Sequence, residues 1–303
     1  DAIVFAVIAA TFVRMFTLEA YKIPTTSMEG SLLAGDFLFV SKFNYGARIP
    51  QTPLGIPFFH HSLPNNLGKA YSKLIQLPYK RLPGFEDIKR GDIVVFNYPG
   101  DAIENPDRPV DKRENYVKRC VGIAGDTLRL VNGIVYVNGQ QSVVQPKSQL
   151  WYTVKTNGQQ FDYEILKNEI DVDVSKEIDR PNGGMDNHRN KIELDDYDAK
   201  NGQYKMLLTN DKLEKLKKLP IVQSVTVSDE GGDFFYPAYY YYRPDSLRNI
   251  NNFPSLWVPK KGATIELNDD NYWKYQRVIR SYEGNELDYV NGKYILNGAP
   301  ATQ

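Results

Sequence analysis

Residues 125–139 read GDTLRLVNGIVYVNG, a stretch that predicts a β-hairpin. Two short runs of Leu, Val, Ile and Tyr flank the pair Asn132-Gly133, which favours the tight turn that joins two antiparallel strands. β-branched and aromatic residues, which suit strands, recur in short runs elsewhere. The chain is therefore expected to be mainly β. Further strands are predicted at residues 36–40 (DFLFV), 93–96 (IVVF) and 116–123 (YVKRCVGI).

A similar sequence pattern occurs near the C-terminus. Residues 285–298 read NELDYVNGKYILNG, and they again carry two Asn-Gly pairs, at Asn291 and Asn297. This predicts a second hairpin. The shared pattern is too short to establish a duplication, and two unrelated hairpins that use the same turn chemistry are the favoured interpretation.

Composition excludes several classes of function. The 303 residues contain 37 basic and 37 acidic side chains, so the formal net charge is zero, and nothing indicates a nucleic-acid partner. The single cysteine, Cys120, cannot form an internal disulfide and leaves the redox compartment undecided. The three histidines, His60, His61 and His188, show no metal-ligand spacing. No metal and no cofactor are expected.

The N-terminus is apolar. Residues 2–13 read AIVFAVIAATFV, and Arg14 interrupts the run before Met15 and Phe16. A bilayer span takes about 20 residues, so a buried helix and the apolar part of a signal peptide are alternatives. Because the chain continues without a stop into an extended segment, we expect a truncated transmembrane anchor over residues 1–18. The chain, which begins at Asp1, is expected to be a fragment of a longer one.

The rest of the chain contains two regions of different composition. Residues 46–90 are rich in Pro and Gly and predict a loop, in which Phe58 and Phe59 could pack in the core or contact lipid. Residues 141–254 predict an inserted α+β subdomain, with a helix near residues 210–219 that Thr209 or Asn210 could cap. The aromatic run at 234–242 (FFYPAYYYY) favours packing over a recognition surface. Residues 255–303 are expected to return to the β core.

A serine hydrolase without a suitable histidine can use a neutral lysine as its base. Lys118 lies within a predicted strand, between Val117 and the apolar pair that begins at Cys120. Burial there would disfavour the charged amine and lower its pKa. Most lysines in strands point to water, so the strand alone does not identify a base.

Three segments resemble the conserved boxes of the bacterial type I signal peptidases, the Ser/Lys leader peptidases of family S26. The segment 23–46 (IPTTSMEGSLLAGDFLFVSKFNYG) is similar to their nucleophile box, 91–96 (GDIVVF) to the next, and 116–128 (YVKRCVGIAGDTL) to the box with their general-base lysine. Each match is weak alone, but the three stand in the family's order and spacing. The resemblance covers residues 1–140 and, loosely, the final hairpin.

The resemblance implies a signal-peptidase-type antiparallel β catalytic core over residues 19–140. Ser27 would be the nucleophile and Lys118 the general base, and the Thr25 hydroxyl with the Ser27 backbone N–H would form the oxyanion hole. The substrate would be a preprotein cut after an Ala-x-Ala-like site through an acyl-enzyme. Shallow apolar pockets for the small side chains would be lined by Ile23, Met28, Leu32, Tyr116 and Val117.

The resemblance also implies a place in the cell. The enzyme would lie in the bacterial inner (plasma) membrane with its catalytic body on the extracytoplasmic side, and its partners would be signal-peptide-bearing preproteins, the lipid bilayer and the secretion machinery.

The chain departs from the family pattern at three points. Gly30 and Ala124 stand where the family often has proline, which affects turn rigidity. The last family box, Gly-Asp-Asn-Arg and its serine, does not occur in residues 141–303, and we expect it beyond Gln303. Two alternatives stay open: a catalytically inactive, membrane-tethered homologue that binds signal sequences or a secretion partner, and a Ser/Lys hydrolase of the self-cleaving repressor type.

Overall fold

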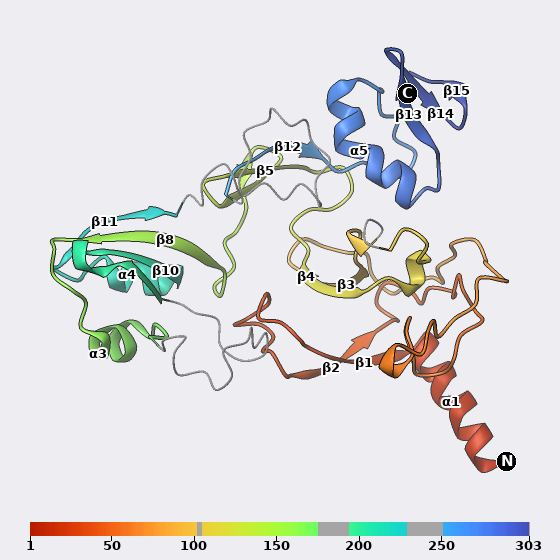
Figure 1. The fold of residues 1–303 in the computed structure, drawn as a ribbon, viewed down its shortest axis with the longest axis horizontal. Coiled ribbons are helices and arrows are strands. Elements are labelled where there is room, and N and C mark those ends of the chain that lie inside the picture. The colour runs from red at the N-terminus through yellow and green to blue at the C-terminus, as the bar shows by residue number, and fades with distance from the viewer. Residues whose placement is uncertain (102–104, 175–193, 229–250, 303) are drawn as a thin grey trace.

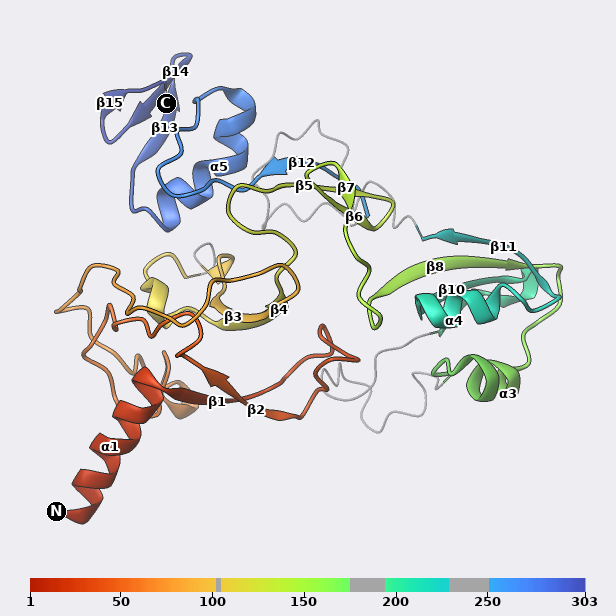
Figure 2. The same cartoon turned by 180° about the vertical axis from the view of Figure 1, so that it is seen from behind.

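The computed structural model describes residues 1–101, 105–174, 194–228 and 251–302. Five antiparallel sheets and a few short helices make up this part of the chain, which confirms the prediction of a mainly β protein (Figures 1 and 2). The four-stranded sheet that contains β8 and β10 lies at one end of the molecule, and the last helix and hairpin lie at another.

Two short ribbons form the region of the predicted dyad. Strand β1 (Leu18–Lys22) pairs with β2 (Phe37–Ser41), and β3 (Ile93–Asn97) pairs with β4 (Asn115–Arg119). The three predicted runs at 36–40, 93–96 and 116–123 each overlap one of these strands. The last of them is shorter than predicted, because the ladder between β3 and β4 ends at the Ile93–Arg119 pair.

Both predicted hairpins are present. The first comprises β5 (Thr127–Val131), β6 (Ile134–Val137) and β7 (Gln140–Gln141), and β12 (Phe253–Trp257) pairs with its free edge at β5. The second comprises β13 (Leu287–Val290), β14 (Lys293–Leu296) and β15 (Ala299–Pro300).

The two hairpins share their turn geometry. Asn132 and Gly133 have φ values of 48° and 76°, and Asn291 and Gly292 have 50° and 76°. Asparagine and glycine tolerate this left-handed region, which the tight turn requires.

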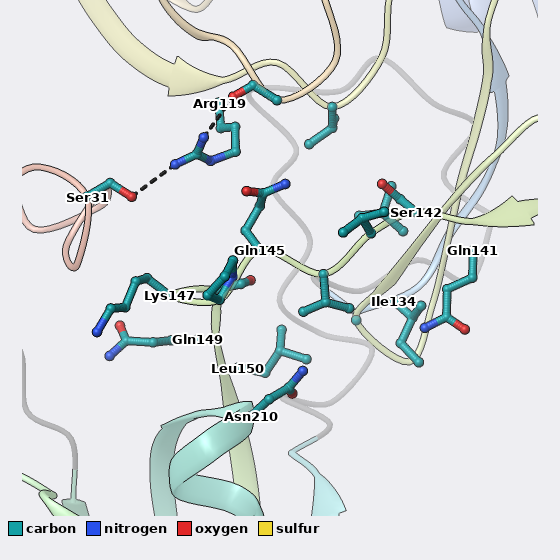
Figure 3. Close-up of a pocket in the computed structure, with 18 of the residues that line it drawn as sticks. Ser31, Arg119, Ile134, Gln141, Ser142, Gln145, Lys147, Gln149, Leu150 and Asn210 are labelled. Atoms are coloured by element: carbon teal, nitrogen blue, oxygen red, sulfur yellow. Dashed lines mark hydrogen bonds between the residues drawn. The ribbon is translucent and has the colours of Figure 1, made fainter.

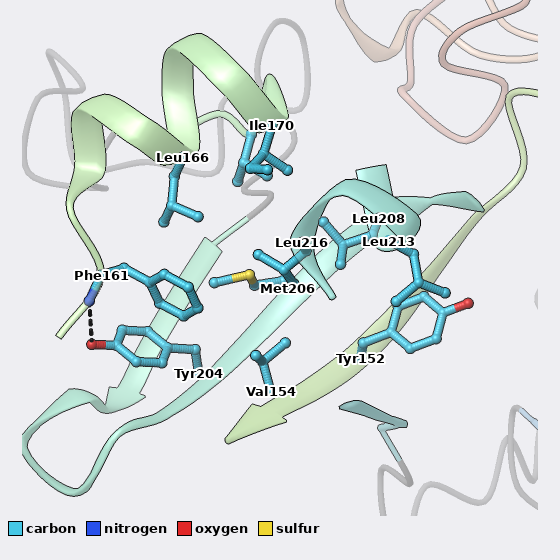
Figure 4. Packing of buried hydrophobic residues seen from close by; sticks show 11 residues of the cluster. Tyr152, Val154, Phe161, Leu166, Ile170, Tyr204, Met206, Leu208, Leu213 and Leu216 are labelled. Carbon is cyan, nitrogen blue, oxygen red and sulfur yellow. Dashed lines mark hydrogen bonds between the residues drawn. The ribbon is translucent and has the colours of Figure 1, made fainter. Parts of the chain in front are cut away.

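The described residues between 149 and 227 build an α+β unit around a cluster of buried apolar side chains. Its sheet has the order β11-β8-β10-β9, and two helical segments cover one face of it (Figure 4). Val154, Leu166, Met206 and Leu216 are fully buried in this cluster. The strands are β8 (Gln149–Thr156), β9 (Leu194–Asp198), β10 (Gln203–Thr209) and β11 (Val222–Val227), and the helical segments are α3 (Tyr163–Ile165), η3 (Leu166–Ile170), η5 (Ala199–Asn201) and α4 (Asn210–Leu216).

Helix α4 confirms the predicted helix near residues 210–219. The Thr209 hydroxyl caps it by accepting a hydrogen bond from the Lys212 backbone N–H, and Leu213 and Leu216 are buried on its apolar face. The helix ends at Leu216, three residues earlier than predicted.

Three further helices lie outside this unit. η1 (Pro64–Asn66) and η2 (Val110–Lys112) are single turns in the loop-rich regions, and α5 (Asp269–Ser281) precedes the second hairpin. The Asn268 side chain caps α5 by accepting from the Asn271 N–H at 2.9 Å. Within residues 46–90 the structure has isolated bridges and turns but no strand of a named sheet, as the Pro-rich sequence predicts.

The predicted transmembrane anchor over residues 1–18 is not found. Helix α1 (Ala2–Phe16) has 15 residues, and at about 1.5 Å per residue it is shorter than the roughly 30 Å of a bilayer's apolar core. No helix among the described residues has both the length and the apolar character needed to cross a membrane. The apolar run is helical, as its composition suggested, but Thr17 ends it before β1 begins.

Some predictions fall outside the described residues. The aromatic run at 234–242 and the polar stretch around His188 are among them. The α+β unit at 149–227 lies within the predicted insert at 141–254, and the insert's boundaries stay a prediction.

Candidate active site

Ser27 lies at the exposed tip of a turn that connects β1 to β2. Pro24, which fixes its own φ and has no N–H to donate, directs the chain out of the ladder. Ile23 closes the neck of the turn, since its N–H donates to the Asp36 carbonyl at 2.9 Å and its carbonyl accepts from the Gly35 N–H at 2.8 Å. The two ends of the turn are thereby fixed, and Ser27 projects from it.

Lys118 reaches this turn from β4, where it pairs with Val94 of β3. Its Nζ donates a hydrogen bond to the Ser27 Oγ at 2.5 Å, across a sequence separation of 91 residues. The Tyr116 ring, two residues earlier on the same face of the strand, has its centroid 5.7 Å from that Nζ. The structure thus brings together the two side chains that the sequence predicted as nucleophile and base.

Burial lowers the pKa of Lys118 below the ordinary value of 10.5. The cause is loss of solvation, which penalises the ammonium more than the neutral amine. Among the described residues no carboxylate forms an ion pair with Lys118, so no anion offsets this effect. The Tyr116 face attracts a cation, but such contacts are worth only about 0.5–1 kcal/mol at partly exposed sites. A lysine with these surroundings is suited to accept a proton.

Thr25 lies beside the nucleophile, with its Oγ1 at 3.3 Å from the Ser27 Oγ. Its hydroxyl is exposed on the same turn and shares the side of the turn from which Ser27 projects. A threonine at this place can donate a hydrogen bond to charge that develops next to Ser27.

The five residues predicted to line apolar pockets are not equivalent. Ile23 and Met28 are buried, at 4% and 9% exposure, and Leu32 is half-buried. Tyr116 shares the Lys118 face of β4 and is exposed. Val117 faces the other way, because side chains alternate along a strand. The Val117 side chain therefore lies on the opposite face of β4 from Lys118, and its place in a substrate pocket stays a prediction.

Arg119 joins the strand of the base to the turn of the nucleophile. Its guanidinium donates to the Gly91 carbonyl at 2.7 Å and to the Ser31 Oγ at 3.0 Å. Two elements that are distant in sequence are thus connected next to the dyad. The following Gly125-Asp126 turn is fixed by Arg90, whose guanidinium holds the pKa of the Asp126 carboxyl well below its usual range.

Sequence reasoning missed two contacts in this region. The Tyr98 ring stacks on Tyr116 with centroids 4.1 Å apart, and no sequence signal indicated that pair. The Lys147 stem lies against Gly30, where an added Cβ would come within 2.8 Å of the Lys147 Cβ. The one sequence feature that could have indicated the contact with Lys147 is that position 30 has glycine where the family often has proline.

The described residues contain no group of three or more His, Cys, Asp or Glu side chains that could hold a metal ion. Cys120 is a free thiol whose pKa is raised by burial, so it is less reactive than an exposed one.

Comparison with known proteins identifies the family. The sequence model described as "Signal peptidase, peptidase S26" matches residues 1–204. The Signal peptidase I of Pseudomonas aeruginosa is 34% identical over 128 residues, 42% of this chain and 32% of that protein. The Signal peptidase I of Rickettsia massiliae is 27% identical over 138 residues, 46% of this chain and 41% of that protein. The match thus spans about two fifths or less of the length of these relatives.

The matched residues contain both ribbons of the site, the nucleophile turn and the first hairpin. The family match therefore covers the segments that carry Ser27 and Lys118, and the chain belongs to the signal peptidase family, peptidase S26.

Proposed function

We propose that this protein is a serine endopeptidase that removes N-terminal signal peptides from exported preproteins with a Ser27–Lys118 dyad. The observation that carries the proposal is the 2.5 Å contact between the Lys118 Nζ and the Ser27 Oγ. Burial lowers the pKa of Lys118, which increases the share of neutral amine at a given pH. The family to which the chain belongs supports the same reaction.

In the proposed reaction the neutral Lys118 amine takes the Ser27 proton while the Ser27 Oγ attacks the scissile carbonyl carbon. The tetrahedral intermediate collapses, the C–N bond breaks, and the ammonium of Lys118 gives its proton to the leaving amine. An acyl-enzyme on Ser27 remains. Lys118 is neutral again and deprotonates a water that attacks the ester carbonyl carbon. The bond from this carbon to the Ser27 Oγ breaks, and the Lys118 ammonium returns its proton to that Oγ, so that both groups regain their first state.

The substrate is proposed to be an extended peptide with small residues, typically Ala, at the first and third positions before the cut. Ile23, Tyr116 and the Val117 backbone would border this segment upstream of the dyad, and Met28 and Leu32 would form the base of the site. The bilayer, the secretion machinery and an extracytoplasmic catalytic body belong to the proposal as its cellular setting. The division into a core at 19–140, an insert at 141–254 and a return at 255–303 belongs to it as well.

Thr25→Val is expected to lower kcat by about 10²-fold, because one of the two donors to the oxyanion is lost while the size of the side chain is kept. Thr25→Ser keeps the hydroxyl and is expected to retain most of the rate. Steady-state kinetics on a signal-peptide substrate would separate kcat from KM. Equal rates for the Val and Ser variants would contradict the oxyanion role of Thr25.

The proposed function is tested by incubating the protein, in detergent, with a peptide that contains an Ala-x-Ala site. Mass spectrometry of the products is expected to place the cut after the second Ala, and substitution of that Ala by Leu is expected to abolish it. Ser27→Ala is expected to remove activity, whereas Ser31→Ala, on the same turn, is expected to keep more than a tenth of it. A folded protein that does not cut the peptide would favour the inactive binding homologue.

A further inference from the structure

A cleft of about 860 Å³ begins at the predicted nucleophile and extends toward the α+β unit. One wall consists of Ser27 and its turn together with Cys120 and Val121, which follow β4. The opposite wall, which we call the far wall, consists of residues 140–150 and Asn210 of α4. Figure 3 shows Ser31 and Arg119 on one side of this cleft, and Lys147, Gln149 and Asn210 across from them. A volume of this size accommodates several residues of an extended chain.

The residues that line the cleft indicate on which side of the scissile bond it lies. Apart from Thr26 and Ser27 itself, the near-wall residues of the two segments that carry the dyad follow Ser27 and Lys118 in the sequence, as Met28 and Val121 do. Ile23 and Tyr116, which precede the dyad on the same two segments, are described residues that do not line it. If the signal peptide lies along the preceding residues, as proposed above, the cleft lies on the other side of the scissile bond.

The far wall has the chemistry to hold polypeptide backbone. It is rich in side-chain amides, which both donate and accept hydrogen bonds, as peptide groups require. Apolar contacts come from two valines of the same segment, Val143 and Val144, which are 82% and 43% exposed. The amide side chains are those of Gln140, Gln141, Gln145, Gln149 and Asn210.

The far wall also contacts the nucleophile turn directly. Gly30, with φ of +83°, leaves space that the Lys147 stem occupies, and a Cβ there would come within 2.8 Å of the Lys147 Cβ. A side chain at position 30 would therefore displace the wall. The contact positions the segment that leads into β8 at a fixed distance from Ser27.

From this arrangement we propose that the far wall is a substrate subsite that binds the mature segment of the preprotein, on the carboxyl side of the cut. The inference rests on the proposed function, since it uses the direction in which a signal peptide would lie. It assigns a role in the same reaction to the segment between the catalytic core and the inserted unit. The preferred ligands would be mature segments in an extended conformation, whose backbone N–H and C=O groups can bond the side-chain amides of the far wall.

Two peptides with the same Ala-x-Ala site test the proposal, one ending two residues after the cut and the other six. The intact protein is expected to cleave the longer peptide with a kcat/KM about tenfold higher, as roughly 1.4 kcal/mol of added binding would give. A triple variant, Val143→Ala, Val144→Ala and Gln145→Ala, is expected to lose this gain while cleaving the short peptide at the parent rate. Lys155→Ala, exposed on β8 and outside the cleft, is the control and should keep the gain.

A binding readout makes the result independent of turnover. In Ser27→Ala protein, a peptide with a photoreactive benzoylphenylalanine at the third position after the cut is expected to crosslink to residues 140–150. Cleavage of both peptides with the length gain retained in the triple variant would overturn the inference but not the proposed function. If a folded protein cleaves neither peptide, the proposed function fails. Crosslinks only to residues outside 140–150 would overturn the inference whatever the cleavage result.

Discussion

Lys118→Met is expected to lower kcat/KM for a signal-peptide substrate by at least about 10⁴-fold. Removal of a single member of a nucleophile–base unit in serine proteases typically costs about as much as removal of the whole unit, up to roughly 10⁶-fold. Methionine keeps the length and apolar stem of the lysine but cannot take the Ser27 proton. Because Lys118 is only half-buried and forms no ion pair among the described residues, the substitution should leave the fold intact.

The pH profile of the parent protein gives a second readout of the same role. Only the neutral amine accepts a proton, so kcat/KM should rise about tenfold per pH unit until the pKa of Lys118 and then level off. Burial lowers the pKa of Lys118, so the plateau should begin at a lower pH than for an exposed lysine. Lys69→Met, at an exposed loop position, should show the parent profile. A Lys118→Met protein with more than a hundredth of the parent activity would exclude Lys118 as the base.

The sequence was sufficient for elements that are fixed by local chemistry. The Asn-Gly pairs at Asn132 and Asn291 determine their turns within a few residues, so both hairpins could be predicted from the sequence. The cap of α4 was predicted as one of two neighbouring residues, Thr209 or Asn210, and the structure has Thr209. The Ser27–Lys118 contact could also be predicted, but only because the resemblance to a family related two segments 91 residues apart.

Other features depend on contacts that no local pattern encodes. The edge of β5 pairs with β12, whose residues lie more than 110 positions later, and nothing in either strand specifies its partner. Helix α5 buries Tyr275 and Gln276 in place of a simple Leu stripe, so its helical periodicity was not recognised in the sequence. The far wall of the cleft is formed by a polar linker. Its place beside the nucleophile turn depends on the contact between the Lys147 stem and Gly30, which no local sequence pattern encodes.

The transmembrane anchor predicted over residues 1–18 is not found, since no helix among the described residues is long and apolar enough to cross a membrane. Its twelve-residue apolar run was extended in the prediction by Met15 and Phe16 and by the expectation of a partial span. In the structure Thr17 ends the helix, and Leu18 opens a strand whose partner is Ser41. Pairing with β2 therefore fixes the C-terminal end of this helix.

Leu216→Ala is expected to destabilise the α+β unit at 149–227 by about 2–5 kcal/mol. The Leu216 side chain has 0% exposure, and truncation removes buried methyl groups and leaves a cavity that the surrounding side chains of the cluster cannot fully close. Leu216→Met nearly preserves the volume and should cost less than about 1.5 kcal/mol. The apolar cluster is confined to this unit, so the loss should be local.

Hydrogen exchange is the measurement that can resolve a local loss. The amides of Val154 in β8 and Met206 in β10 are expected to exchange about 30- to 4,000-fold faster in the Ala variant, which is the same 2–5 kcal/mol expressed as an opening equilibrium. The amide of Leu130, in the first hairpin, should keep its rate, and cleavage of a short peptide should be unchanged because Ser27 and Lys118 lie on other sheets. Equal acceleration at Leu130 would mean that the unit and the first hairpin unfold together, so that the loss of stability is not local.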